Sequence, residues 1–144
     1  MQSRVKSLFE RYERAFNQAL AGQEDMDEIA AFYTNEFIAA SPAGVMGGKN
    51  DAQLRQVMTQ GYAYYRQIGT RAMRVREIRI APIDEQHCIA HVGWRAIYRK
   101  AQEAAEIVIE FEVHYLVQLL NGTAKIFGWI AGDEQALLRE RGII

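Results

Sequence analysis

The pattern of hydrophobic and polar positions in the second half of the chain predicts long β-strands. Between residues 106 and 120, apolar and polar side chains alternate with the two-residue period of a strand that buries one face. Asn121-Gly122 follows, and this pair tolerates the positive φ angles of a two-residue hairpin turn. The alternation then resumes, which predicts a hairpin over residues 106–133. The positions expected on its apolar face after the turn are Ala124, Ile126, Gly128 and Ile130.

Two further strands are predicted before this hairpin, over residues 71–80 and 88–100. In the first of them, the apolar positions change phase between Val75 and Ile78. An extra residue in one strand of a pair produces such a change, so the pattern predicts a β-bulge that bends the sheet.

The register between the second strand and the hairpin follows from a turn placed near residues 101–105. This turn sets Trp94 opposite Phe111 on an apolar face. On the other face it sets Arg95 opposite Glu110, and opposite charges across two strands favour that pairing. The same register brings His91 opposite His114, Gly93 opposite Glu112 and, across the hairpin, Gln118 opposite Lys125.

The first half of the chain shows the three- and four-residue steps of amphipathic helices. Helices are predicted over residues 3–21, about 25–33, and from an N-cap at Asn50 to Ile68, with a short strand at 37–42 and a turn or small hairpin at 43–48 between the last two. A last short helix is predicted over 134–141, capped by Asp133.

These elements predict an α+β fold in one domain, residues 1–144. A curved antiparallel sheet with one apolar face needs a cover, and the three helices of the first half are the available material. The sheet is therefore expected to wrap around them as a cone-like α+β barrel, with the short C-terminal helix beside it. The closed end of such a cone is filled by side chains, and its open end can form a pocket.

Composition narrows the class of protein and of partner. The chain is 49% hydrophobic and 24% charged with a net charge of −1, so no basic surface is expected to bind nucleic acid. No stretch has the length of a membrane span or a signal peptide, so the chain is expected to be cytoplasmic and not to bind membranes. The single cysteine, Cys88, is expected to be a buried strand residue. No P-loop, GxGxxG, CxxC or HExxH motif occurs, so neither a cofactor nor a metal is predicted.

Three segments resemble one superfamily. They are DMDEIAAFYTNEF, ASPAG followed by GGKNDAQLRQVM, and NGTAKIFGWIAGDEQALL. With them, the order helix, helix, short strand, glycine turn, helix and long antiparallel strands is similar to the nuclear transport factor 2-like superfamily, which includes SnoaL-like and ketosteroid isomerase-like proteins. The resemblance implies the cone-shaped fold. Members include isomerases, dehydratases, cyclases and binding domains, so it does not choose among these activities.

Candidates for catalysis follow from the resemblance. Ketosteroid isomerases use a general-base Asp, and the position that looks equivalent here is Ser41, whose hydroxyl is a poor base at neutral pH. Tyr12 is a candidate for the oxyanion-donating Tyr, although its helical spacing among Leu8 and Phe16 is more typical of a core residue. SnoaL-like enzymes use a His and Asp pair, for which the candidates are Asp84, His87, His91, His114 and Asp133. His87 is expected in a solvated turn and Asp133 at a helix cap, so no catalytic residue is assigned.

An aromatic set is predicted to line the pocket. Tyr and Trp offer a large apolar body with one polar tip, which suits a small, partly apolar organic ligand. The same set is also typical of a packed core. Its members are Tyr33, Tyr62, Tyr65, Trp94, Tyr98 and Tyr115.

The opposite face of the sheet mixes charges with apolar residues, which predicts a contact surface. We expect an isologous homodimer through this face. The interface residues expected are His91, Arg95, Glu110, Glu112, His114, Phe127 and Trp129. Two histidines with carboxylates beside them are also compatible with a metal ion, although their spacing does not predict one.

Three functions remain open at this point. The first is a pocket protein that binds a small organic molecule. The second is an isomerase, cyclase or dehydratase that uses tyrosine hydroxyls, water, and Asp133 or a histidine. The third is a dimeric interaction module whose cone is packed shut. A buried titratable group with a perturbed pKa in an open pocket distinguishes an enzyme from a binder.

Overall fold

The structure is a computed structural model that describes residues 1–102 and 104–144. Its helices are α1 (Gln2–Leu20), α2 (Met26–Ala31), α3 (Ala52–Gln67) and α4 (Glu134–Glu140). Its strands are β1 (Tyr33–Ser41), β2 (Gly44–Lys49), β3 (Thr70–Pro82), β4 (His87–Tyr98), β5 (Ile107–Leu120) and β6 (Thr123–Ala131). The predicted turn at 101–105 includes residue 103, which lies outside the described residues.

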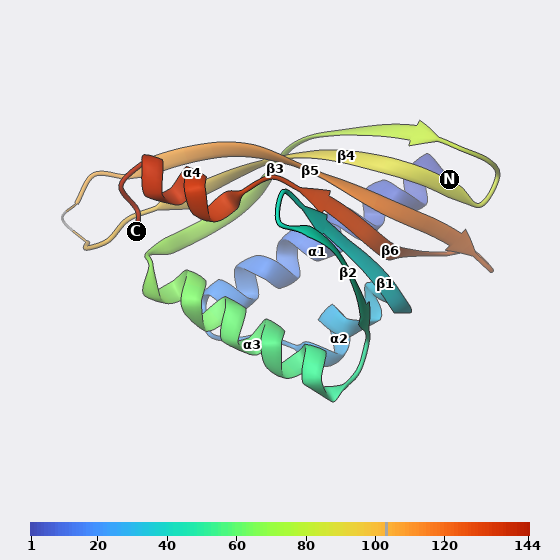
Figure 1. Cartoon of the computed structure of the whole chain (residues 1–144), viewed down its shortest axis with the longest axis horizontal. Coiled ribbons are helices and arrows are strands. Elements are labelled where there is room, and N and C mark those ends of the chain that lie inside the picture. Colours follow the sequence, from blue (N-terminus) through green and yellow to red (C-terminus); the bar gives the residue numbers. More distant parts are fainter. Residues whose placement is uncertain (103) are drawn as a thin grey trace.

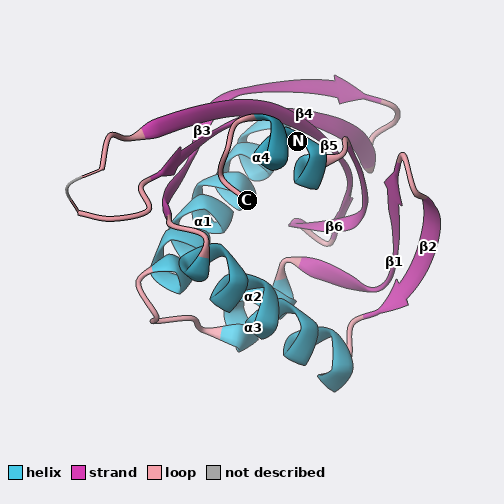
Figure 2. Ribbon diagram, turned by 60° about the vertical axis from the view of Figure 1, so that its left-hand side comes forward, coloured by secondary structure: helices cyan, strands magenta, loops and turns pink. Residues whose placement is uncertain are grey.

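A single six-stranded sheet, ordered β2-β1-β6-β5-β4-β3, curves around the helices without closing into a barrel (Figures 1 and 2). This confirms the α+β fold with a helix-backed curved sheet. The sheet is not wholly antiparallel, because β1 runs parallel to β6. The hairpin of β1 and β2 extends the sheet beyond β6 and bends toward α3 (Figure 2).

The register predicted from the charge pattern is confirmed along β4 and β5. Trp94 pairs with Phe111, Arg95 with Glu110, and His91 with His114. The hairpin turn is also confirmed, since Asn121 has φ 54° and Gly122 has φ 77°. The predicted bulge of β3 is present as a register shift between Val75 and Glu77.

A second bulge, which the pattern did not predict, changes which residues of β6 face inward. Val117 pairs with Ile126, but the preceding Leu116 pairs with Gly128, so β6 has one extra residue at this point. Because neighbouring residues of a strand point to opposite faces, the extra residue exchanges the faces of all positions that follow. Trp129 therefore lies on the concave face, and Ile130, expected inside, is 47% exposed.

Helix α1 crosses the concave face and is bound to the bulged strand β3 by two polar side chains. The amide of Asn17 donates to the backbone oxygen of Met73 at 2.7 Å and accepts from its N–H at 3.0 Å. The carboxylate of Glu13 accepts from the N–H of Val75 at 3.0 Å. Strand β3 is the edge strand of the sheet, so these bonds satisfy backbone groups that have no neighbouring strand, and they fix the helix against the sheet.

The start of α3 differs by one residue from the prediction. Asp51, not Asn50, caps the helix and accepts from the N–H of Leu54 at 3.0 Å. The Asn50 amide instead donates to the backbone oxygens of Ala30 and Tyr33. It therefore joins the end of α2 to the beginning of α3. Tyr33 begins β1 and does not end α2.

The length and hydrophobicity of the helices bear on whether the chain crosses a membrane. Among the described residues, no helix combines the length and hydrophobicity that crossing a membrane requires.

Candidate functional site

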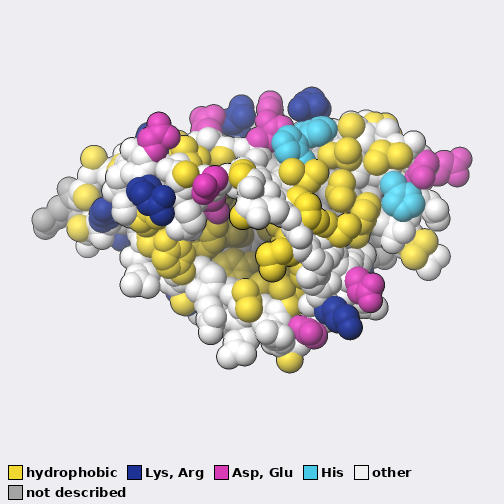
Figure 3. Space-filling model, viewed as in Figure 1, with side chains coloured by type: hydrophobic (Ala, Val, Ile, Leu, Met, Phe, Trp, Pro, Cys, Tyr) yellow, Lys and Arg dark blue, Asp and Glu magenta, His cyan; other side chains and the backbone are white. Residues whose placement is uncertain are grey.

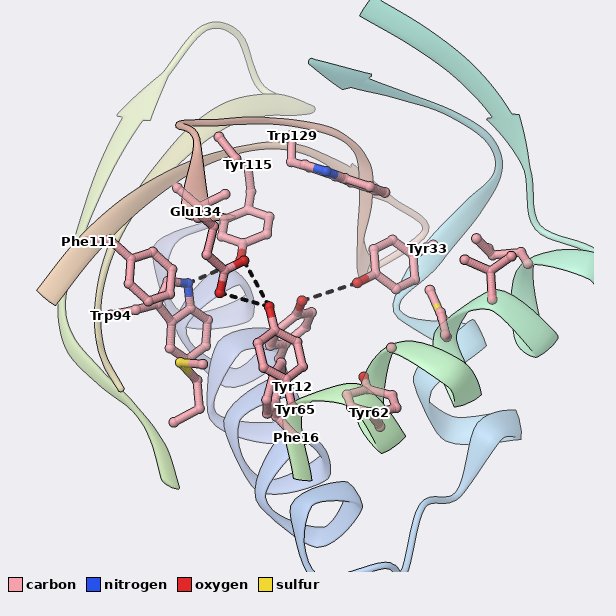
Figure 4. Close-up of a pocket in the computed structure, with 17 residues that line it drawn as sticks. Tyr12, Phe16, Tyr33, Tyr62, Tyr65, Trp94, Phe111, Tyr115, Trp129 and Glu134 are labelled. Atoms are coloured by element: carbon pink, nitrogen blue, oxygen red, sulfur yellow. Dashed lines mark hydrogen bonds between the residues drawn. The ribbon is translucent and has the colours of Figure 1, made fainter. Parts of the chain in front are cut away.

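A cavity of about 340 Å³ lies between α1, α3 and the concave face of the sheet. In the space-filling view it is a hollow with hydrophobic side chains on its floor (Figure 3). Helix α3 forms its outer wall through Leu54, Val57, Met58 and Gly61, which explains why the apolar stripe predicted for this helix contains no fully buried residue. The polar and aromatic residues that line the cavity are Tyr12, Phe16, Tyr33, Tyr62, Tyr65, Trp94, Phe111, Tyr115, Trp129 and Glu134 (Figure 4).

Most of the predicted aromatic set meets at this cavity. Tyr33 comes from β1, Tyr62 and Tyr65 from α3, Trp94 from β4 and Tyr115 from β5. Tyr98 is the exception. It is buried at the end of β4, where it pairs with Thr70 and Ile107 in the sheet, and it is not among the lining residues.

Trp129, predicted for the outer face and the dimer interface, also belongs to this cavity. Its ring packs on Phe37 at a centroid distance of 5.2 Å and edge-on to Tyr33 at 5.7 Å. The second bulge is the physical reason, because it turns the Trp129 side chain to the concave face.

Several tyrosine hydroxyls of the cavity form hydrogen bonds, either with another tyrosine or with the indole of Trp94. The Tyr33 hydroxyl donates to that of Tyr12 at 3.2 Å, and the Trp94 indole N–H donates to the Tyr115 hydroxyl at 3.1 Å (Figure 4). Burial raises the pKa of Tyr12, Tyr33, Tyr62, Tyr65 and Tyr115. These phenols therefore stay neutral near neutral pH and act as hydrogen-bonding groups, not as bases.

Glu134 adds a carboxyl group to the aromatic lining. It is the first residue of α4, and its side chain points from the end of β6 toward the rings of the cavity (Figure 4). The Tyr65 hydroxyl donates to both carboxylate oxygens, at 2.9 and 2.8 Å. Burial raises the pKa of Glu134, and the bond from Tyr65 opposes part of this effect.

Glu134 was not among the residues predicted from the sequence, which pointed to its neighbour Asp133. Asp133 caps α4 by accepting from the N–H of Ala136 at 2.9 Å, and its side chain is exposed. Glu134 stands one helical turn before Leu138, which is buried in the core. The four-residue spacing to a buried leucine is the signal that could have placed Glu134 on the inward face of the helix.

Among the other catalytic candidates, Tyr12 lines the cavity, whereas Ser41, Asp84 and the histidines are not among its lining residues. The Ser41 hydroxyl accepts from the N–H of Ala43 in the β1–β2 turn at 3.2 Å. His87 does not stand free in a turn, since it begins β4, where its Nδ1 lies 2.9 Å from Asp84 Oδ1 and its Nε2 lies 3.2 Å from Gln118 Nε2. Of the described residues that line the cavity, none is a histidine.

His91 and His114 face each other across β4 and β5 on the outer face of the sheet. Their Nδ1 atoms are 2.6 Å apart, so one of the two nitrogens carries a hydrogen atom and donates a hydrogen bond to the other. Partial burial, followed by the charge of Arg79, lowers the pKa of His91. With Glu112, this pair could hold a metal ion, because their ligand atoms lie within 4.8 Å of one another and imidazole and carboxylate are ordinary Zn²⁺ ligands.

Comparison with known proteins places the chain in a family. The family described as NTF2-like protein (DUF6841) matches residues 2–134. The chain belongs to this NTF2-like family. Among curated proteins, none matches this sequence.

Solved structures of NTF2-like proteins share the fold. An NTF2-like protein with a cystatin-like fold from Novosphingobium aromaticivorans is 10% identical, with a TM-score of 0.69 over 98% of this chain and 88% of its own. An NTF-2 like protein of unknown function from Shewanella oneidensis is 13% identical, with a TM-score of 0.67 over 92% and 98%. A ketosteroid isomerase-like protein from Erwinia carotovora is 13% identical, with a TM-score of 0.62 over 90% and 93%. At these identities the likeness concerns the fold alone.

Proposed function

We propose that this NTF2-like protein binds a small, largely apolar organic molecule in the cavity between α3 and the sheet. The observation that carries the proposal is the cavity itself, whose volume of about 340 Å³ falls within the range of ligand pockets. Its walls combine aromatic rings with a few convergent hydroxyl groups, an indole N–H and one carboxyl. Such a lining suits a ligand that is apolar over most of its surface and polar at one end.

The cavity also bears on the third hypothesis, a cone packed shut. A packed interior leaves few voids larger than a water molecule. An opening of this size, lined by residues from α1, α3, β4, β5 and β6, favours a binding function over a closed interaction module.

An acid–base enzyme is the second candidate, and Glu134 is the observation that favours it. A carboxyl whose pKa is raised by burial can both accept and return a proton, as isomerases, cyclases and dehydratases require. The Tyr12, Tyr33 and Tyr115 hydroxyls would supply hydrogen bonds to an oxygen of the substrate. Glu134 thus takes the role that the sequence had offered to Asp133 or a histidine.

A thermal-melting screen tests the binding proposal, with a panel of aromatic, lactone, steroid-like and acyl compounds. A ligand at about 100 times its dissociation constant adds about 2.7 kcal/mol of stability, which raises the melting temperature by several degrees. Gly61→Phe supplies the control, because a Cβ at Gly61 meets open space beside the cavity and a larger side chain there fills it. A shift present in wild type and Gly61→Ala but absent in Gly61→Phe supports the proposal. No shift across the whole panel contradicts it.

A ligand from that screen then tests the enzyme candidate. If the ligand has an acidic C–H bond, the exchange of that hydrogen for deuterium in D₂O can be followed by proton NMR with catalytic amounts of protein. Exchange that is fast with wild type and lost in Glu134→Gln, while the ligand still shifts the melting temperature of the variant, supports catalysis. Equal exchange with both proteins rules out Glu134 as the base.

The expected homodimer and the cytoplasmic location stay predictions. The outer face of the sheet keeps His91, Arg95, Glu110, Glu112 and His114 of the proposed interface, and Phe127 lies edge-on to His87 at 6.0 Å, whereas Trp129 is on the other face. Val108 on the same face is 41% exposed, which favours a contact there. Light scattering at micromolar concentration should return twice the chain mass of 16.4 kDa, and a monomer mass contradicts the dimer.

A further inference from the structure

The charge of the cavity lining restricts the kind of ligand that it can take. Of the described residues that line the cavity, one is a carboxylic acid and none is Lys, Arg or His. An anionic ligand would meet no cation there and would lie close to Glu134. The lining therefore disfavours carboxylates and phosphates and leaves neutral and cationic molecules.

The aromatic walls favour the cationic molecules. The face of an aromatic ring carries negative charge density, so ammonium groups are attracted to it, and cages of Trp and Tyr recognise quaternary ammonium ions. Here the rings of Tyr12, Trp94 and Tyr115 pack against one another, with centroid distances of 5.7 Å from Tyr12 to Trp94 and 5.9 Å from Tyr12 to Tyr115, and together form one aromatic wall of the cavity. Glu134 projects toward this group from the end of β6 (Figure 4).

We propose that the ligand is an organic cation, a substituted ammonium ion whose charge lies against this aromatic wall beside the Glu134 carboxylate and whose apolar part extends toward α3. The inference rests on the proposed function and names the chemical class of its ligand. A carboxylate in an apolar cavity lacks a counter-charge, and an ammonium ligand supplies one. The Tyr65 hydroxyl, which donates to both oxygens, holds the carboxylate in place.

Binding should depend on pH through Glu134. The Tyr65 hydroxyl from α3 is bonded to its carboxyl, and the charge of Glu134 also raises the pKa of Tyr12 from α1 and Tyr98 from β4, so that all three phenols stay neutral. Glu112 and Asp133 also line the groove next to it, but the Glu112 carboxylate lies 3.6 Å from Arg79 and that of Asp133 caps α4. A quaternary ammonium ion has no proton to lose, so its affinity reports the protein alone. The affinity should rise with pH as Glu134 loses its proton.

Calorimetric titration with two matched probes tests the inference. Benzyltrimethylammonium carries the charge, and neopentylbenzene is its uncharged isostere. Glu134→Gln keeps the shape of the side chain without its charge, and Glu140→Gln, an exposed residue of the same helix, serves as control. We expect the ammonium ion to bind wild type and Glu140→Gln alike, and to bind Glu134→Gln about tenfold more weakly or worse. The uncharged probe should bind both Glu variants as it binds wild type.

The outcomes separate the inference from the proposed function. Ammonium binding that is weakened in Glu134→Gln and strengthened by rising pH supports the inference. Ammonium binding unaffected by Glu134→Gln, or binding of the uncharged probe alone, overturns the inference and leaves the proposed function standing. If neither probe binds, and no compound of the broad panel shifts the melting temperature, the proposed function fails as well. Circular dichroism of each variant confirms that it is folded.

Discussion

Adjacent residues of β4 show how different the two faces of the sheet are. Trp94 is 2% exposed and lines the cavity, whereas the side chain of Arg95, the next residue, is 48% exposed and pairs with Glu110 on the outer face. The concave face gathers aromatic rings around an open space. The outer face carries cross-strand charges, which specify the register of the strands more than they stabilise them.

The charged groups of the two faces differ in the same way. On the outer face Glu110 pairs with Arg76 at 3.0 Å and Arg95 at 3.2 Å, and Glu112 lies 3.6 Å from Arg79. On the concave face Glu134 has a phenol as its partner and no cation among the described lining residues. Compensated charges are typical of a solvated or contact surface, and a half-buried carboxyl without a cation beside it is typical of a functional site.

The largest effect should come from truncating the inward residue of the β4 pair. Trp94→Ala removes a buried indole and leaves the Tyr115 hydroxyl without its donor, so we expect it to cost about 3 to 5 kcal/mol of unfolding free energy. Arg95→Ala removes one exposed ion pair and should cost under about 1 kcal/mol. Urea denaturation measures both. Similar losses of unfolding free energy for the two variants would contradict the difference between the two faces.

Gly61 offers a change on the cavity side that should stabilise the protein. Gly61→Ala lowers the conformational freedom of the unfolded chain at a position in α3, so we expect a gain of about 0.5 to 1 kcal/mol. Gly61→Phe should keep a similar helix and abolish ligand binding, since its ring enters the cavity. Thermal melting with and without ligand checks both. A destabilised Gly61→Ala would mean that the space beside α3 is not open.

Glu134→Gln tests whether the concave face holds a destabilised carboxylate. Burial raises the pKa of Glu134 above its ordinary value of 4.5, so the folded protein binds this proton more tightly than the unfolded chain does. The carboxyl therefore contributes its full stabilisation when the pH is below its ordinary pKa. This stabilisation is lost as the pH rises through the higher pKa of the folded protein. The unfolding free energy of wild type relative to Glu134→Gln should fall with rising pH. A difference that rises with pH contradicts the prediction.

His91→Gln should show the smallest effect and the opposite sign. Partial burial and Arg79 lower the pKa of His91 below 6.5, so the folded protein binds this proton less tightly than the unfolded chain does. Its contribution to stability is present above 6.5 and is lost as pH falls below that value. The unfolding free energy of wild type relative to His91→Gln should therefore fall with decreasing pH. Urea titrations between pH 5 and 8 check this.

The fold was predictable because its signals are local or repeat along a strand. The alternation of apolar residues and the charge pair of Arg95 with Glu110 specified the register, and Asn121-Gly122 specified the turn. The phase change after Val75 located the bulge of β3. Each signal depends on neighbours in sequence or on residues that face each other across two strands.

The candidate site was predictable only in part, because it depends on details that alternation hides. The bulge of β6 lies opposite Leu116 and Val117. The hydrophobic pattern does not reveal it, because both faces of β6 contain apolar residues, and its effect is that Trp129 lies at the cavity and not on the outer face. Glu134 was overlooked because a charged residue in the first turn of a helix is common for electrostatic reasons alone. Its inward direction depends on how α4 packs through Leu138.

Tryptophan fluorescence tests most directly the central claim that the concave face holds a ligand. The chain has two tryptophans, and both Trp94 and Trp129 line the cavity. Titration with a ligand from the melting screen should change their emission saturably, at one ligand per chain, and the change should be absent in Gly61→Phe. A ligand that stabilises the protein while tryptophan emission stays constant at saturation would show that it binds elsewhere and would contradict the account.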